Sequence, residues 1–298
     1  MSMTTTARDL REGGAWSPLQ TLKNDAIWLV ASAALFLVGR LSRATLVRGG
    51  RALGALVHAL AANLRNRARE NVARAMPNET RSEVRAIARA SFSNLGENLA
   101  RAWSDRELLP MPEASRAILR EALEEGRGVV LPSAHLGPWE RLAATLAGSG
   151  FPLTAIVRES YDPRFDEVTT ASRDRAGFAT IARGAPGAAT RIVRTLRQGR
   201  VLGIPMDLKT RAESVTVPLL GAPARTPVGP ARIALRTGAP VVVCTVEPNE
   251  EGVLAVTCTR LARRDETPEA LTGRINAELS RRILAAPEHW LWMHDRFG

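Results

Sequence analysis

Gly-Val-Val-Leu-Pro-Ser-Ala-His, from Gly128 to His135, is followed two residues later by Pro-Trp-Glu-Arg-Leu-Ala-Ala-Thr-Leu-Ala-Gly, from Pro138 to Gly148. The first run is short and almost wholly apolar, which is typical of a strand buried on both faces. The second run opens on proline and stops at glycine, which is typical of a helix. A strand followed at once by a helix is the building unit of a parallel sheet.

The same alternation continues to the end of the chain. Further strands are predicted at 153–158, 178–182, 201–207, 214–220, 239–246 and 252–260, and further helices at 164–176, 188–199, 228–237 and 268–285. Residues 80–125 have apolar positions three or four apart, which predicts helix. We therefore predict an α/β fold, a mostly parallel mixed sheet flanked by helices. The catalytic domain is expected over 76–298, continuous with the helices before it.

The N-terminal part has a different character. Residues 1–25 are polar and are expected to be flexible, and 26–75 are expected to form an apolar anchor helix and a basic helical segment. The 14 uncharged residues from Ala26 to Gly39 would make a helix of roughly 21 Å, short for about 30 Å of hydrocarbon. A buried core helix and a membrane anchor both fit that run. Eight arginines and one acid between Arg40 and Arg74 favour an anionic membrane surface.

Composition limits the possible functions. The 298 residues carry 41 Lys and Arg against 30 Asp and Glu, a net charge of +11, and 45% are hydrophobic, which excludes general disorder. All the basic residues except Lys23 and Lys209 are arginines, which grip phosphate and carboxylate well. Aromatic residues make up only 4%, too few for surfaces that stack nucleic-acid bases. Cys244 and Cys258 lie in apolar runs and are expected to be separate buried side chains.

His135 is the main candidate for catalysis. It stands at the predicted carboxyl end of a strand, where open α/β sheets bind their ligands. Glu140 follows five residues later, in the first turn of the next helix, and could accept the Nδ1 proton and leave Nε2 as a general base. Helix capping by Glu140 is the alternative explanation. The spacing matches no metal site, and there is no serine nucleophile motif and no P-loop.

Six blocks in order resemble one known family. They are the helical run before Arg40, Arg-Glu-Asn-Val-Ala-Arg-Ala-Met-Pro with Asn71 and Pro77, His-Leu-Gly-Pro-Trp-Glu, the strand ending at Arg158, the segment ending at Asp207 with the residues after it, and Trp-Leu-Trp-Met-His near the C-terminus. They are similar to the bacterial lipid A biosynthesis acyltransferase family, within the glycerolipid acyltransferase superfamily. The resemblance covers roughly residues 26–298 and implies a fold like that of glycerol-3-phosphate acyltransferase.

The resemblance implies transfer of a fatty acyl group from a thioester to a hydroxyl of a lipid A-type glycolipid. It implies acyl carrier protein, or coenzyme A, as the acyl carrier, and direct transfer without metal or cofactor. The site would be at the cytoplasmic side of the inner membrane. His135 would be the base and Glu140 would steady its imidazolium. Substrate contacts are expected at Arg158, Asp207, Gly221, Arg225 and Thr226, while Trp290, Trp292 and His294 are expected to be structural.

Other interpretations fit the same residues. The acceptor could be a phosphatidylinositol mannoside, another glycolipid or a specialised lipid. The same histidine could activate water in a thioesterase or lipid hydrolase. A further interpretation is not an enzyme at all, but a basic, non-catalytic protein that binds membranes or nucleic acid. Arg158 could form a surface salt bridge, Asp207 could cap a turn, and the small residues around Gly221 could form a simple turn.

Overall fold

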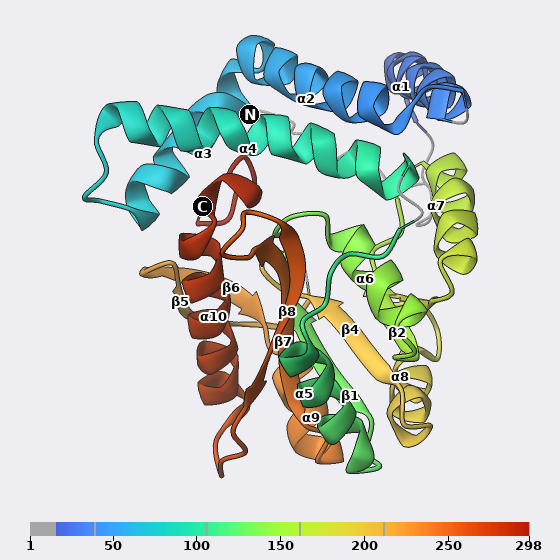
Figure 1. The fold of residues 1–298 in the computed structure, drawn as a ribbon, viewed down its shortest axis with the longest axis vertical. Helices are drawn as coiled ribbons and strands as arrows, with labels where there is room; N and C mark the ends of the chain where they lie inside the picture. Colours follow the sequence, from blue (N-terminus) through green and yellow to red (C-terminus); the bar gives the residue numbers. More distant parts are fainter. Residues whose placement is uncertain (1–15, 39, 105–106, 161, 211, 298) are drawn as a thin grey trace.

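A six-stranded sheet lies at the centre of the molecule, shown here as a computed structural model that describes residues 16–38, 40–104, 107–160, 162–210 and 212–297 (Figure 1). Its strands are β1 (Val129–Ser133), β2 (Leu153–Val157), β3 (Ala179–Ala182), β4 (Val201–Pro205), β7 (Val241–Pro248) and β8 (Leu254–Leu261), in the order β3-β2-β4-β1-β7-β8. All neighbours pair parallel except β7 and β8, which are antiparallel. The predicted mostly parallel mixed sheet is therefore confirmed.

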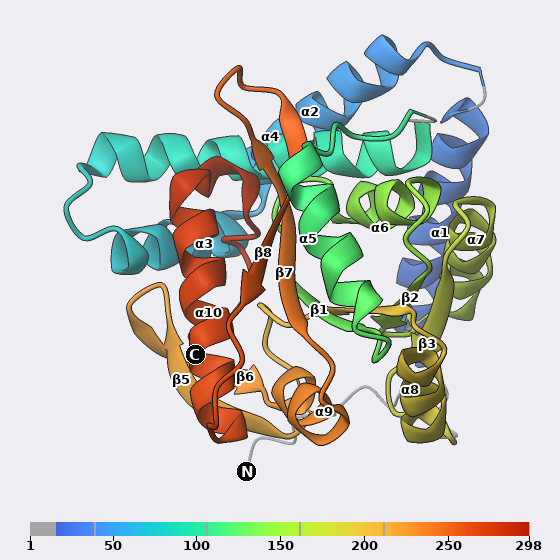
Figure 2. The ribbon, with the colours of Figure 1, turned by 60° about the horizontal axis from the view of Figure 1, so that its bottom comes forward.

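Helices cover both faces of the sheet (Figure 2). They are α5 (Glu113–Glu124), α6 (Trp139–Gly148), α7 (Pro163–Arg175), α8 (Ala188–Arg197), α9 (Gly229–Thr237) and α10 (Pro268–Ala285). Successive residues of β1 point to opposite faces, so Leu131 packs with α5 and α6 while Val130 packs with α8, α9 and α10. Every residue of β1 is buried, which explains why its sequence is almost continuously apolar.

Residues 214–227 form a separate hairpin of β5 (Ser214–Leu219) and β6 (Ala222–Pro227). The sequence predicted only the first of these strands. Leu220 and Gly221 connect them with φ angles of 53° and 75°. A two-residue turn with both φ angles positive matches the twist of a hairpin and favours glycine. The small residues around Gly221 therefore do form a turn.

Before α5 in the chain come α1 (Pro18–Val38), α2 (Arg43–Leu60), α3 (Ala62–Ala75) and α4 (Arg81–Ser104). α1 begins at Pro18 and so takes in part of the segment expected to be flexible, while residues 1–15 of that segment lie outside the described residues. In the described part of the chain, no helix is long and apolar enough to span a bilayer. The predicted membrane anchor is therefore not confirmed.

α2 and α4 cross with their backbones in contact. A Cβ added to Gly96 would lie 2.0 Å from the Gly50 carbonyl oxygen, and one added to Gly54 would lie 2.1 Å from that of Phe92. Only glycine allows this approach, because any side chain would push the helices apart.

The antiparallel register of β7 and β8 places Cys244 directly opposite Cys258. The structure joins the two residues in a disulfide. The expectation of two separate buried cysteines was therefore wrong, because their pairing depends on the register of two strands and not on either strand alone.

Candidate active site

The site lies at the carboxyl edge of the sheet, where β1 and β4 run side by side. Their register pairs Ser133 with Pro205, the last residues of the two strands. Two residues farther along each chain stand His135 and Asp207. Asp207 Oδ1 lies 2.8 Å from His135 Nδ1, and Asp207 Oδ2 accepts a hydrogen bond of 2.9 Å from the His135 backbone N–H. The two parallel strands thus bring together a histidine and a carboxylate that are 72 residues apart in the chain.

Asp207 is fully buried (0% exposed), and a third donor reaches it. The Trp290 indole N–H donates to Oδ2 at 2.7 Å. Burial by itself would raise the pKa of the Asp207 carboxyl, but the positive charge of protonated His135 and these hydrogen bonds hold it below its ordinary value. Asp207 is therefore ionised at neutral pH. The sequence predicted Asp207 as a substrate contact, with capping of a turn as the alternative, and the structure places its carboxylate against His135.

The His135 ring is 22% exposed and can be reached by a ligand. Burial alone would lower the pKa of the imidazole, but the charge and hydrogen bond of Asp207, with a smaller contribution from Glu140, raise it. The edge of the Trp139 ring system lies against His135, with centroids 5.0 Å apart. Because Nδ1 faces Asp207, Nε2 is the nitrogen left for substrate.

Glu140 does not make the predicted contact with Nδ1. It lies in the first turn of α6, and its carboxylate pairs with Arg173 of α7, at 2.7 Å from Nη2 and 3.3 Å from Nε. Glu140 acts on His135 through its charge alone. The prediction failed because a strand-to-helix turn allows several carboxylate positions, and Arg173 competes for this one.

Two arginines stand side by side at the same edge. β2 and β3 pair Val157 with Ala182, and each strand is followed by an arginine, Arg158 and Arg183. Burial, and then the charge of Arg158, lower the pKa of Arg183. The sequence singled out Arg158 as a candidate phosphate ligand and missed Arg183. The signal for Arg183 was its place directly after a predicted strand.

The other predicted substrate contacts lie on the hairpin. Gly221 forms its turn, and the Arg225 carbonyl accepts a hydrogen bond from Arg296 at 2.8 Å. Thr226 is fully buried, and its hydroxyl oxygen accepts from Asn276 at 2.9 Å and from Arg296 at 2.8 Å. The Thr226 side chain is therefore held by Asn276 and Arg296 in the interior of the protein.

The C-terminal segment packs against the buried side of the His135–Asp207 pair. Trp290 and Trp292 are buried, as expected, and meet edge to face with centroids 4.8 Å apart. Asn71 of α3 donates to the carbonyls of Trp292 (2.8 Å) and His294 (2.9 Å), which ties this segment to the N-terminal helices. The sequence did not indicate the hydrogen bond from the Trp290 indole to Asp207.

An apolar cavity of about 70 Å³ lies under α6, and Trp139, which contacts His135, is part of its lining. Leu131, Leu142, Leu146, Leu153 and Phe178 line it, with Glu140 and Arg173 at its polar side. A second cavity of about 150 Å³ shares Trp139, Glu140, Arg173 and Phe178 with it and extends toward α4. Among the residues that the structure describes, no three His, Cys, Asp or Glu side chains gather where they could hold a metal ion.

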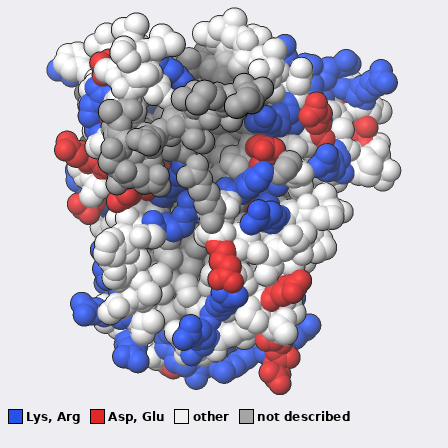
Figure 3. All heavy atoms as spheres, turned by 180° about the vertical axis from the view of Figure 1, so that it is seen from behind, with Lys and Arg blue, Asp and Glu red and all other residues white. Residues whose placement is uncertain are grey.

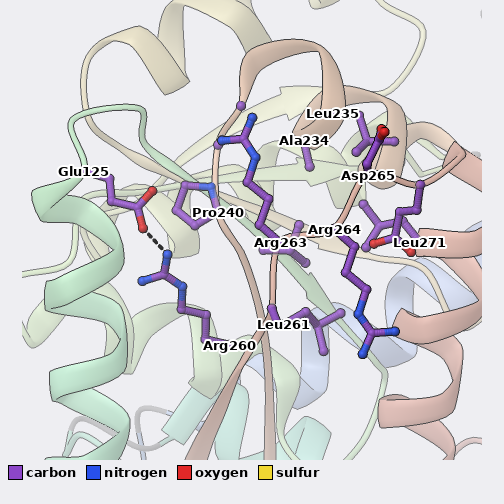
Figure 4. A pocket seen from close by; sticks show the side chains of 15 residues that line it. Glu125, Ala234, Leu235, Pro240, Arg260, Leu261, Arg263, Arg264, Asp265 and Leu271 are labelled. Carbon is purple, nitrogen blue, oxygen red and sulfur yellow. Dashed lines mark hydrogen bonds and ion pairs between the residues drawn. The ribbon is translucent and has the colours of Figure 1, made fainter.

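A pocket of about 590 Å³ lies at the opposite edge of the sheet, around the start of β7 and the end of β8 (Figure 4). Arg260 pairs there with Glu125, and Arg263 and Arg264 stand near Asp265. The positive and negative side chains of its lining balance. The pocket is separated from His135 by the length of β1.

Comparison with known proteins agrees with this geometry. A phosphatidylinositol mannoside acyltransferase of Mycolicibacterium smegmatis is 25% identical over 240 residues, which cover 74% of this chain and 76% of that protein. The sequence profile described as bacterial lipid A biosynthesis acyltransferase matches residues 16–298. The match covers nearly the whole chain, so this protein is an acyltransferase that belongs to the bacterial lipid A biosynthesis acyltransferase family.

Proposed function

We propose that the protein transfers a fatty acyl group from a thioester to a hydroxyl of a membrane glycolipid, with His135 as general base. The observation that carries the proposal is the His135–Asp207 pair at the open carboxyl edge of the sheet. Asp207 holds Nδ1 and leaves Nε2 facing the site, which is the arrangement a general base requires.

The reaction follows from this geometry. Nε2 of neutral His135 takes the proton of the acceptor hydroxyl while the hydroxyl oxygen attacks the carbonyl carbon of the thioester. The C–S bond then breaks, and the imidazolium returns the proton to the leaving thiolate. Asp207 stabilises the imidazolium, and its buried carboxylate needs no solvent rearrangement to do so. A positioned base contributes about 10²–10⁴-fold, and the site must supply the rest by holding both substrates. Glu140 adds negative charge near the imidazolium, and neither metal nor cofactor takes part.

The surroundings of the dyad suit both substrates. The two cavities under α6, of about 70 and 150 Å³, are proposed to take only part of the acyl chain, because leucine, tryptophan and phenylalanine side chains line them. Arg158 and Arg183 are proposed to bind a phosphate of the acceptor or of the donor. The donor is acyl carrier protein or coenzyme A, and the acceptor is a glycolipid of the lipid A or phosphatidylinositol mannoside type. The relative from M. smegmatis supports the second acceptor and the family description supports the first.

We also propose that α1 and α2 lie on the membrane surface, at the cytoplasmic side of the inner membrane. On α1, Leu29 is 71% and Val30 is 70% exposed. Other exposed apolar side chains of these helices are Leu19, Leu22, Phe36, Leu53, Leu56 and Leu60. Figure 1 has these helices at the upper end of the molecule, where the described atoms in Figure 3 are mostly uncharged, with basic side chains at the upper right. An apolar patch beside basic residues suits an anionic lipid surface.

α1 also contacts the catalytic part of the chain. Asp25 pairs with Arg164 of α7 at 2.9 Å, and Trp28 meets Phe165 edge to face with centroids 5.1 Å apart. α7 also carries Arg173, which lines the cavity under α6. If α1 lies on the membrane, its contacts with α7 place this cavity near the membrane surface, where a lipid acceptor is found.

Mass spectrometry of total lipids tests the proposal. Cells expressing the wild type, His135→Ala, or His58→Ala as a control far along the chain from the site would be compared. We expect a glycolipid heavier by one acyl group with the wild type and His58→Ala, and not with His135→Ala. The same product from a folded His135→Ala protein would refute the proposed base. In vitro, release of the acyl group as free acid regardless of the acceptor would make the protein a hydrolase.

A further inference from the structure

We propose that Trp290 is a positioning residue of this active site, whose indole N–H fixes the Asp207 carboxylate in the orientation that serves His135. The inference rests on the proposed role of His135 as general base. It assigns a function to a tryptophan that the sequence placed only in the core.

The argument begins with the oxygens of Asp207. Oδ1 faces the His135 ring, while Oδ2 receives two donors, the His135 backbone N–H and the Trp290 indole. The terminal torsion of an aspartate is soft, so one ring contact would not define the plane of the carboxylate. Two donors on Oδ2 define it. Asp207 has no exposed surface, so solvent cannot take the place of the indole.

The indole is itself held on several sides. Trp292 packs edge to face against it, and Asn94 donates to the Glu288 carbonyl two residues upstream, at 2.9 Å. The Gly137 N–H, in the turn that follows His135, donates to the His289 carbonyl at 3.0 Å. A Cβ on Gly137 would meet the Val246 carbonyl oxygen at 2.7 Å, so this turn sits tightly on β7. The turn that carries the base and the segment that carries Trp290 are therefore bonded to each other.

Trp292 offers a matched comparison. It is as fully buried as Trp290 and two residues away, but its indole N–H donates to the backbone carbonyl of Pro287 at 2.6 Å. If Trp290 served packing alone, replacing either ring by phenylalanine would have the same kind of effect. If Trp290 positions Asp207, only its replacement would change the behaviour of His135.

The expected change has a definite direction. Without the indole N–H, the negative charge of Asp207 is shared among fewer donors and attracts the His135 proton more strongly. The other charged or titratable groups that act on this pair are Glu140 of α6 and His294 and Arg296 of the C-terminal segment, and Trp290→Phe leaves them in place. The pKa of His135, already raised by Asp207, should rise further. The acidic limb of the rate profile should then move to higher pH.

The test compares Trp290→Phe with Trp292→Phe in the purified full-length enzyme, measuring kcat, KM, the pH profile and thermal unfolding. For Trp290→Phe we expect kcat to fall about 10- to 100-fold, the value of one hydrogen bond to a charged group, with KM nearly unchanged. We expect its acidic limb to move to higher pH. Trp292→Phe should lower thermal stability and leave the limb in place. An unshifted limb in Trp290→Phe, or equal shifts in both variants, would overturn the proposal.

A second measurement does not depend on activity or on the folding of Trp290→Phe. In wild-type protein with ¹⁵N-labelled tryptophan, the indole resonance of Trp290 should titrate with the His135 ring and be insensitive to pH in His135→Ala. The resonance lost in Trp292→Phe should show no such titration. A chemical shift of the Trp290 indole that does not change as His135 titrates would overturn the inference. Retained transferase activity in His135→Ala would instead refute the proposed function, so the two failures are distinguishable.

Discussion

Asp207→Asn is the substitution that most directly tests the proposed dyad. Asparagine has nearly the same volume, but it has one oxygen and no charge. Asp207 accepts three hydrogen bonds through two oxygens, so the amide of the variant must turn its NH₂ toward at least one donor. If the NH₂ faces Nδ1, that nitrogen becomes the acceptor and Nε2 carries the proton. His135 would then hold the wrong tautomer for a base.

The expected magnitude follows from these contacts. The variant removes the charge that stabilises the imidazolium and disturbs the tautomer, so most of the contribution of the base should disappear. We expect kcat to fall by about 10²–10⁴-fold. Glu140→Gln is the matched comparison, because it breaks no hydrogen bond to His135 and loosens only a partly exposed ion pair with Arg173. Such pairs are worth about 0–1 kcal/mol, so we expect a loss of less than about tenfold.

The pH profile gives an independent sign. Only neutral His135 accepts a proton, so activity should fall as the pH drops through the raised pKa of this residue. Without the charge of Asp207, burial dominates and the pKa falls, so the acidic limb of the residual activity should move to lower pH. Rates would be measured with an acyl thioester and purified acceptor, with thermal unfolding as the folding control. A loss in Glu140→Gln as large as that in Asp207→Asn would refute this reasoning.

Three further predictions concern other parts of the molecule. Gly96→Ala should destabilise the fold by about 1–3 kcal/mol in urea unfolding, because the new Cβ meets the Gly50 carbonyl oxygen. Gly49→Ala is the control, because nothing lies near its Cβ. Equal stabilities of the two variants would contradict the close crossing of α2 and α4. Arg183→Gln should raise KM for the phosphate-bearing substrate about tenfold, and an unchanged KM would remove this residue from the phosphate site. Leu29→Asp together with Val30→Asp should reduce binding to anionic vesicles at least about tenfold in a sedimentation assay, while Val193→Asp on α8 serves as the control; undiminished binding would count against a membrane-facing α1.

Much of the fold could be predicted from the sequence, because the central strands β1, β4 and β7 are buried on both faces and helices separate most of the strands along the chain. The strand before His135, the helix after Pro138 and the final helix at 268–285 are all present. The second strand of the hairpin was missed because Ala222–Pro227 contains two prolines and only one β-branched residue, Thr226. It pairs with β5, and Asn276 of α10 donates to Thr226 at its end; neither contact can be read from the segment itself.

The site shows a sharper limit. The ends of two strands were placed at His135 and Asp207, yet Glu140 was chosen as the partner because it is near in sequence. What the sequence lacks is the order of the strands. Once β4 lies beside β1 with Ser133 opposite Pro205, the two chains leave the sheet side by side, about 4.8 Å apart, and His135 and Asp207 follow at equal distances from these ends. Any two polar residues that follow neighbouring parallel strands at equal distances are therefore candidate partners, and Arg158 with Arg183 are the second such pair in this protein.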